Sequence, residues 1–155
     1  MNRIAAAFTK SGGDLTTVYL ALIDTPSAWR DQPAKYKTPN KLLTSAYRAV
    51  HKAVRNPPLL ESTLEQMGQT TWMPSSPAGW SDTAVGWDGA DALSKRIRWA
   101  ADMGQEFGTR VDARALGVEV LGLAPDDHTS EAIQRADSGP QALTLLLASP
   151  EFQQR

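Results

Sequence analysis

The residues that could perform acid–base or metal chemistry are few, and their spacing does not form a catalytic pattern. The two histidines, His51 and His128, have no metal-ligating partner three or four residues away. Glu61 and Glu65 are one helical turn apart, but paired carboxylates need a facing partner for acid–base catalysis, and the sequence does not provide one. The sequence therefore predicts no catalytic residue and no metal site.

The candidate nucleophiles lead to the same expectation. Ser75, Ser76 and Ser81 do not stand in the G-x-S-x-G frame that presents a nucleophilic serine, and the chain has no cysteine. The glycine-bearing stretch from 68 to 79 lacks the G-K-[ST] ending of a phosphate-binding loop. We expect no cofactor, and this chain alone is not predicted to be an enzyme.

The most distinctive stretch of the chain runs from residue 67 to 88 and contains Trp72, Trp80 and Trp87, three of the five tryptophans. Its prolines and glycines are incompatible with a regular helix or strand. Because each indole can bury a large apolar area, we expect an ordered loop whose indoles pack between the neighbouring helices. Exposed instead, the three indoles with Asp82 and Gln69 would form a stacking platform for a sugar or a partner protein.

Length and composition are those of one globular domain, which we expect to span residues 1–155. The chain is 41% hydrophobic and 21% charged, which argues against global disorder. No apolar run reaches the roughly 18 residues that a transmembrane helix needs. The first 14 residues do not resemble a signal peptide, because their apolar patch is short and soon interrupted.

Charge is distributed unevenly along the chain. Residues 1–59 carry nine Lys or Arg against three acidic residues, whereas residues 60–155 carry seven against fourteen. The predicted helix over 39–55 has no acidic residue. This pattern allows two interpretations: the basic half faces the acidic half within one fold, or the helix over 39–55 binds a polyanion. We favour the first and expect no nucleic-acid partner, because the charges nearly cancel and few aromatic residues interleave with the basic ones.

Apolar residues recur at helical spacing through most of the chain, with Ser, Thr or Asp before many segments and Gly or Pro after them. No segment shows the sustained alternation of a strand. The sequence predicts an all-α fold, an irregular bundle of seven to eight helices around the long Trp/Pro/Gly loop. The expected helices cover residues 3–10, 15–24, 39–55, 59–67, 88–107, 112–120, 130–136 and 141–148. Thr38, Asp88 and Thr129 are expected to cap the helices that follow them, and Pro57 with Pro58 to end the helix before them. The apolar seam expected for the helix over 88–107 consists of Leu93, Ile97, Ala100, Gly104 and Phe107.

Four sequence blocks occur in the order found in a known bacterial family. They are KYKTP at 35–39, MGQ…PSSPAGW at 67–80, a further tryptophan at 87 before a helix with two arginines, and LLLASPEFQ at 145–153. Together with AFTKSGGDL at 7–15, they resemble the C-terminal part of the domain-of-unknown-function family 1800 (DUF1800) over the whole chain. Ser76 stands where the family usually has a second proline, so the loop is expected to be less stiff.

The resemblance implies the C-terminal helical part of a larger bacterial protein that is exported to the periplasm or beyond. The family has no established reaction, so we expect a non-catalytic interaction or structural module. Its partner would be an unknown protein or the N-terminal part of the same family protein. One alternative is that Lys35, Lys37, Trp80 and Asp82 form part of the active-site wall of a hydrolase-like enzyme. Polyanion binding by the helix over 39–55 is the other.

Overall fold

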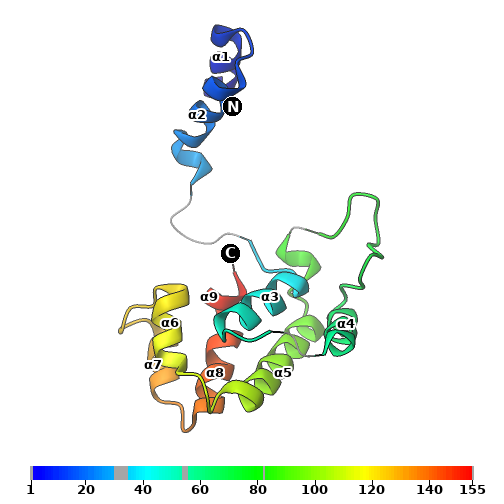
Figure 1. Ribbon diagram of the computed structural model, residues 1–155, viewed down its shortest axis with the longest axis vertical. Coiled ribbons are helices and arrows are strands. Elements are labelled where there is room, and N and C mark those ends of the chain that lie inside the picture. Colours follow the sequence, from blue (N-terminus) through cyan, green and yellow to red (C-terminus); the bar gives the residue numbers. More distant parts are fainter. Residues whose placement is uncertain (1, 30–34, 54–55, 82, 155) are drawn as a thin grey trace. The chain divides into compact units, whose positions relative to one another are not determined.

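A computed structural model describes residues 2–29, 35–53, 56–81 and 83–154. Within these residues the chain forms nine α-helices and two short 3₁₀ helices, with no strand beyond one isolated β-bridge. The all-α prediction is confirmed. The chain divides into two compact units, Met1–Ala34 and Lys35–Arg155 (Figure 1), each described here by itself. A single domain over 1–155 stays a prediction.

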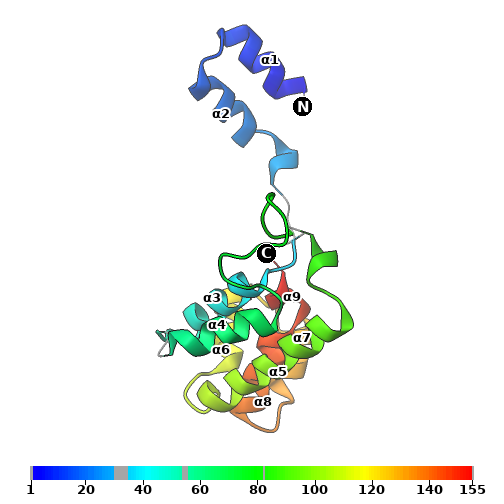
Figure 2. The same ribbon diagram turned by 90° about the vertical axis from the view of Figure 1, so that its right-hand side faces the viewer.

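The first unit is a helical hairpin. Helices α1 (Asn2–Ser11) and α2 (Leu15–Ile23) run side by side (Figure 2) and are followed by the 3₁₀ turn η1 (Pro26–Ala28). Gly12 and Gly13 both adopt positive φ, which allows the chain to reverse after α1. Asp14 then starts α2, because its carboxylate accepts a hydrogen bond from the backbone N–H of Thr17 at 2.8 Å.

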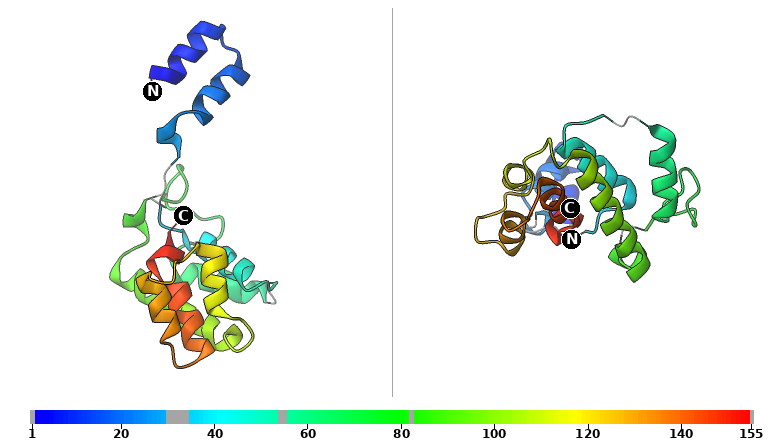
Figure 3. Two further views of the ribbon diagram at one scale, coloured as in Figure 1. Left: turned by 90° about the vertical axis from the view of Figure 1, so that its left-hand side faces the viewer. Right: turned by 90° about the horizontal axis from the view of Figure 1, so that it is seen from below.

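The second unit contains the remaining helices. Its elements are α3 (Pro39–Ala49), α4 (Pro57–Gln66), η2 (Ala84–Gly86), α5 (Ala90–Phe107), α6 (Ala113–Leu121), α7 (His128–Gln134), α8 (Gly139–Ala148) and α9 (Pro150–Gln153). Side chains of Asp112, Ser138 and Ser149 cap α6, α8 and α9 by accepting backbone hydrogen bonds. Helices α6, α7 and α8 pack together (Figure 3). The core lies among α3, α5 and α8 and is rich in leucine.

Helices α5 and α8 lie side by side (Figures 1 and 2), and glycines allow this close approach. A Cβ atom on Gly104 would lie 2.2 Å from Thr144 Oγ1 and 2.5 Å from the carbonyl oxygen of Pro140. At Gly108, just past the end of α5, a Cβ atom would lie 2.4 Å from the Cα atom of Pro140. The backbones are therefore closer here than any side chain larger than hydrogen permits.

Several helix ends differ from the sequence prediction. Pro57 and its neighbour Pro58 open α4 rather than ending the helix before it, because proline at the first helical positions lacks only an N–H that would be unpaired there. Asn56 caps α4 through Leu59 N–H. Asp88 does not cap α5, since Gly89 occupies that position. Thr129 lies within α7 rather than at its start, and its hydroxyl bonds to Glu151.

The largest difference is at the end of α3, which stops at Ala49 rather than at residue 55. His51 adopts the left-handed conformation with φ of 52°, so that its N–H bonds to Arg48 O and Lys52 N–H bonds to Tyr47 O. These two bonds form a Schellman motif, which closes a helix. Arg55 and Val54 lie outside the described residues. The basic helix predicted over 39–55 is therefore wrong in extent: Lys52 lies beyond its end.

The left-handed backbone at His51 leads to a stability prediction. A non-glycine residue in this conformation costs about 1 kcal/mol or more relative to glycine. We expect His51→Gly to raise the free energy of unfolding by about 0.5–1 kcal/mol in chemical denaturation. Lys52→Gly, one residue further on and not at positive φ, is the matched control and should not stabilise. Destabilisation by His51→Gly would contradict this reading of the helix end.

Candidate functional site

The centre of the second unit contains a buried arginine. Arg96 of α5 is only 1% exposed and is among the largest fully buried side chains. Its Nη1 donates to Gln153 Oε1 at 2.9 Å, and its Nη2 donates to the backbone carbonyl of Lys37 at 2.8 Å. Its guanidinium also lies 4.4 Å from the centroid of the Tyr36 ring. A buried charge needs such partners to offset its lost hydration.

The segment before α3 pairs with the segment at the C-terminal end of α9. Lys37 N–H donates to the carbonyl of Gln153 at 2.8 Å, and Tyr36 forms an antiparallel bridge with Gln154. The Lys37 ammonium donates to the carbonyl of Phe152 and lies 4.1 Å from the centroid of its ring. Gln153 completes the network by donating to Leu147 O at 2.8 Å. The first and last family blocks thus meet at Arg96, in what we name the Arg96 junction (Tyr36, Lys37, Arg96, Phe152 and Gln153).

The second block joins the same region through a helix cap. Gly68, with φ of 85°, closes α4 and lets Gln69 N–H bond to Leu64 O. This places the Gln69 side chain at the start of α3, where its Oε1 accepts the Asn40 N–H at 2.7 Å. Thr38, expected to cap α3 itself, makes no side-chain cap bond. A residue from the loop after α4 therefore provides the cap.

Burial affects the titration of the lysine in the junction. Desolvation lowers the pKa of the Lys37 ammonium from its ordinary 10.5 to about 8. Above pH 8 the folded chain releases this proton while the unfolded chain keeps it, so the free energy of unfolding must rise with pH through that range. The rise ends near pH 10. Burial and the Glu106 carboxylate raise the pKa of Tyr47, so above that pH the folded chain keeps a proton that the unfolded chain releases, and the free energy of unfolding falls.

We therefore expect the wild-type midpoint of chemical denaturation to increase between pH 8 and about 9.5. Lys37→Met, which keeps the length of the side chain but cannot titrate, should lack this increase. Unfolding curves at half-unit pH steps for both proteins make the comparison. An identical pH dependence in the two proteins would mean that Lys37 is not desolvated in the fold.

A pocket of about 570 Å³ lies beside α3. Its basic lining comes from Lys37, Lys41 and Arg48, and its apolar lining from Ala49 of α3 and Val120 of α6. We name it the α3 pocket. Lys37 connects it to the Arg96 junction. No tryptophan lines it, so the structure does not bring Lys37 and Trp80 together in this pocket.

The tryptophan loop is only partly packed. Trp87 is 5% exposed and donates from Nε1 to Ser81 O at 2.8 Å, and its ring lies 5.9 Å from that of half-buried Trp80. Trp72 is 93% exposed, and the side chains from 71 to 78 are all exposed. The expectation of a buried indole is confirmed for Trp87 and is wrong for Trp72, because the loop extends from α4 before returning at η2 (Figure 1).

The structure does not place the two other candidate residues, Asp82 and Lys35, in a site. Asp82 lies outside the described residues, so its place in an indole platform stays a prediction. Lys35 is exposed at the start of the second unit and has an interaction partner. With Trp72 exposed and Trp87 buried, the three indoles do not present one continuous face.

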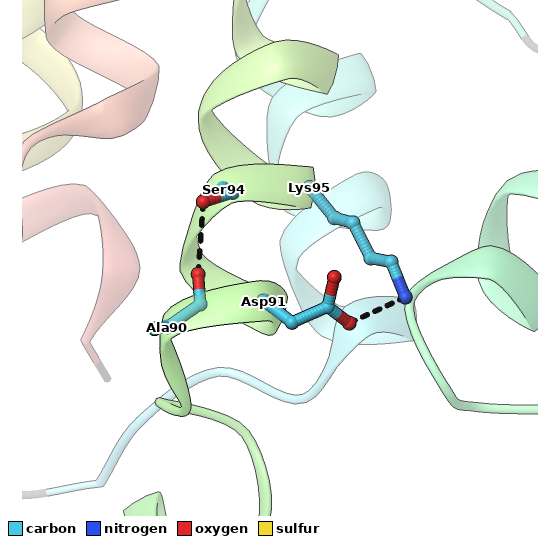
Figure 4. A network of polar contacts seen from close by, with 4 residues as sticks. All are labelled: Ala90, Asp91, Ser94 and Lys95. Carbon is cyan, nitrogen blue, oxygen red and sulfur yellow. Dashed lines mark hydrogen bonds and ion pairs between the residues drawn. The ribbon is translucent and has the colours of Figure 1, made fainter.

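Two basic side chains elsewhere in the second unit, Lys95 and Arg135, form local ion pairs. At the start of α5, Lys95 Nζ lies 2.6 Å from the Asp91 carboxylate, and Ser94 bonds to the Ala90 carbonyl (Figure 4). In α7, Arg135 pairs with Glu131 at 3.1 Å. Lys41 and Arg48 of the α3 pocket form neither an ion pair nor a side-chain hydrogen bond within the part of the chain that the structure describes. Among the described residues, these two cationic groups of the pocket therefore have no ion-pair partner.

Two further properties of the described residues bear on function. In the described ranges, no three His, Cys, Asp or Glu side chains cluster closely enough to hold a metal ion. None of the helices in those ranges is both long and apolar enough to cross a membrane.

Sequence reasoning missed Arg96 as the centre of the junction. We expected the apolar seam of α5 to include Leu93 and Ile97, yet both are exposed. The signal that could have found the buried face is spacing: Arg96 is in helical register with Ala100, Met103 and Phe107, which are all buried.

Comparison with known proteins identifies the family. The sequence model of the family described as "Protein of unknown function (DUF1800)" matches residues 1–154. The chain belongs to this family. Searches of curated proteins and of solved structures find no significant match.

Proposed function

We propose that this chain is a non-catalytic helical interaction module, and that the hairpin of α1 and α2 is the part that binds a protein partner. The observation that carries the proposal is the exposure of the hairpin's apolar side chains. Neither helix has a buried residue. The large apolar side chains of the hairpin and of the η1 turn after it are between 44% and 66% exposed. They are Phe8, Leu15, Tyr19, Leu20, Leu22, Ile23 and Trp29.

Physical reasoning supports a partner for this hairpin. Two helices of ten and nine residues that bury no side chain lack the core that stabilises short helices in water. Large contiguous apolar patches on protein surfaces mark interaction sites. Helix α2 has no charged residue, so a complementary surface would be an apolar helical face, which the hairpin of a second copy of this chain provides. Its binding would supply the missing core.

The Arg96 junction supports the non-catalytic part of the proposal. Its polar groups form hydrogen bonds with one another, and no buried side-chain nitrogen or oxygen among the described residues is left without a partner. Catalytic groups need polar atoms that remain available to a substrate. We therefore assign the family blocks a structural role, which is to hold the start of α3 and the C-terminus of α9 against α5.

The test uses the whole chain as its own partner. A second copy presents the same apolar faces, so raising the protein concentration should increase the mass measured by light scattering and protect residues 2–29 from hydrogen exchange. Leu20→Asp in the apolar face of α2 should abolish both effects, whereas Thr16→Asp, an exposed polar position on the same helix, should not. Two results would overturn the proposal. One is a monomer whose residues 2–29 are already protected at the lowest concentration, and the other is a mass and protection that do not change with concentration.

A further inference from the structure

The α3 pocket has the features of a site for a small anion. Three cationic side chains line it, Lys37, Lys41 and Arg48, against one carboxylate, Glu119. The wall thus has an excess of positive charge. Among the described residues, Lys41 and Arg48 have no acidic ion-pair partner, whereas Lys95 pairs with Asp91 and Arg135 pairs with Glu131.

The pocket also has an apolar part. Ala49 and Val120 line it, and the aliphatic stems of its lysine and arginine side chains add further apolar surface. Its volume, about 570 Å³, falls within the range of roughly 300–1,000 Å³ typical of sites for small organic molecules. A site with a cationic part and an apolar part selects a ligand that combines an anionic group with an apolar body.

We propose that the α3 pocket binds a small organic carboxylate, with the carboxylate held by Lys41 and Arg48 and the apolar body against Ala49 and Val120. Arginine and carboxylate match in geometry and form paired charge-assisted hydrogen bonds. The proposal does not depend on the hairpin, which belongs to the other unit. It also differs from polyanion binding, because α3 ends at Ala49 and Lys52, although basic, does not line the pocket.

The test is a titration of the ¹⁵N-labelled whole chain with naphthalene-2-carboxylate, followed by NMR. We expect a Kd on the order of 1 mM or tighter, as for a ligand of about a dozen heavy atoms. Amide signals of residues 44–49 and 119–120 should shift together. Parallel titrations with naphthalene-2-carboxamide and with inorganic phosphate remove the charge and the apolar body in turn, and each should bind at least about tenfold more weakly.

Paired variants locate the binding. Arg48→Gln and Lys41→Gln should each raise the Kd for the naphthoate about tenfold. Lys52→Gln removes one equal charge from the same basic segment but outside the pocket, and should change the Kd less than twofold. The proposal is overturned if no shifts occur up to 10 mM, if the carboxamide binds equally well, or if Lys52→Gln weakens binding as much as Arg48→Gln.

Discussion

Replacing Gly108 by alanine is expected to lower the free energy of unfolding by about 3 kcal/mol or more, since the added methyl group has no space. Its Cβ atom would lie 2.4 Å from the Cα atom and 2.6 Å from the backbone nitrogen of Pro140. Backbone atoms cannot move aside as the end of a flexible side chain can. The change must therefore separate α5 from α8, the helix pair at the centre of the core.

The matched control is Gly89→Ala at the other end of α5, where an added Cβ atom meets nothing within 4 Å. This change should cost about 1 kcal/mol or less, the usual difference between glycine and alanine at a helix cap. Chemical denaturation of both variants measures the two values. Equal stability of Gly108→Ala and Gly89→Ala would contradict the close approach of α5 and α8.

Replacing Arg96 by alanine is expected to destabilise by about 3–5 kcal/mol. The change deletes the large buried side chain and leaves Gln153 Oε1 and the Lys37 carbonyl without their donor. Some of this loss is offset, because a buried cation carries a desolvation penalty that alanine does not. The cavity and the two unpaired acceptors should outweigh that gain, because Arg96 is 1% exposed and the hole cannot fill with bulk water.

Arg98→Ala is the control for this prediction. Arg98 lies two residues further along α5, is exposed, and forms no side-chain hydrogen bond within the described ranges. Its removal should change the free energy of unfolding by less than about 0.5 kcal/mol. Denaturation midpoints for the two variants provide the comparison. A loss below about 1 kcal/mol for Arg96→Ala would show that the junction does not hold the fold.

Local signals predicted the helices well. Asp14, Asp112 and Ser138 each stand before a helix and accept backbone hydrogen bonds there, as their short polar side chains indicate. Gly122 ends α6 in the left-handed conformation, as a glycine after an apolar run suggests. These features depend on a few neighbouring residues, and so the sequence contains the information directly.

Features that depend on distant residues could not be predicted. The Gln69 cap on α3 joins residues 29 positions apart, and the bond from Arg96 to Gln153 spans 57. Periodicity placed Leu93 and Ile97 in the core of α5, but the exposed fractions of their side chains contradict it. His51 formed the end of α3 although histidine is not the usual residue for a left-handed cap. The Gln69 cap and the Arg96 bond depend on partners far along the chain, whereas the turn at His51 is closed by local hydrogen bonds that its residue type does not indicate.

The candidate site was predicted only in part. Lys37 was selected from its family block, and it lies at both the Arg96 junction and the α3 pocket. The basic segment was recognised by its charge, but its division at Ala49 was not, and this division separates Lys52 from the pocket. Burial of Trp72 was inferred from residue type alone, and the structure places it in solvent.

The central claim is that the first and last sequence blocks meet in one buried structural junction at Arg96, and a double-mutant cycle between Arg96 and Gln153 tests it most directly. Arg96→Ala, Gln153→Ala and the double variant would be compared by chemical denaturation. Either single change leaves the other residue's polar group buried and unpaired. The sum of the two single losses in the free energy of unfolding should therefore exceed the loss of the double variant by about 1 kcal/mol or more. Additive losses would mean that the two blocks do not act together, and would contradict the account.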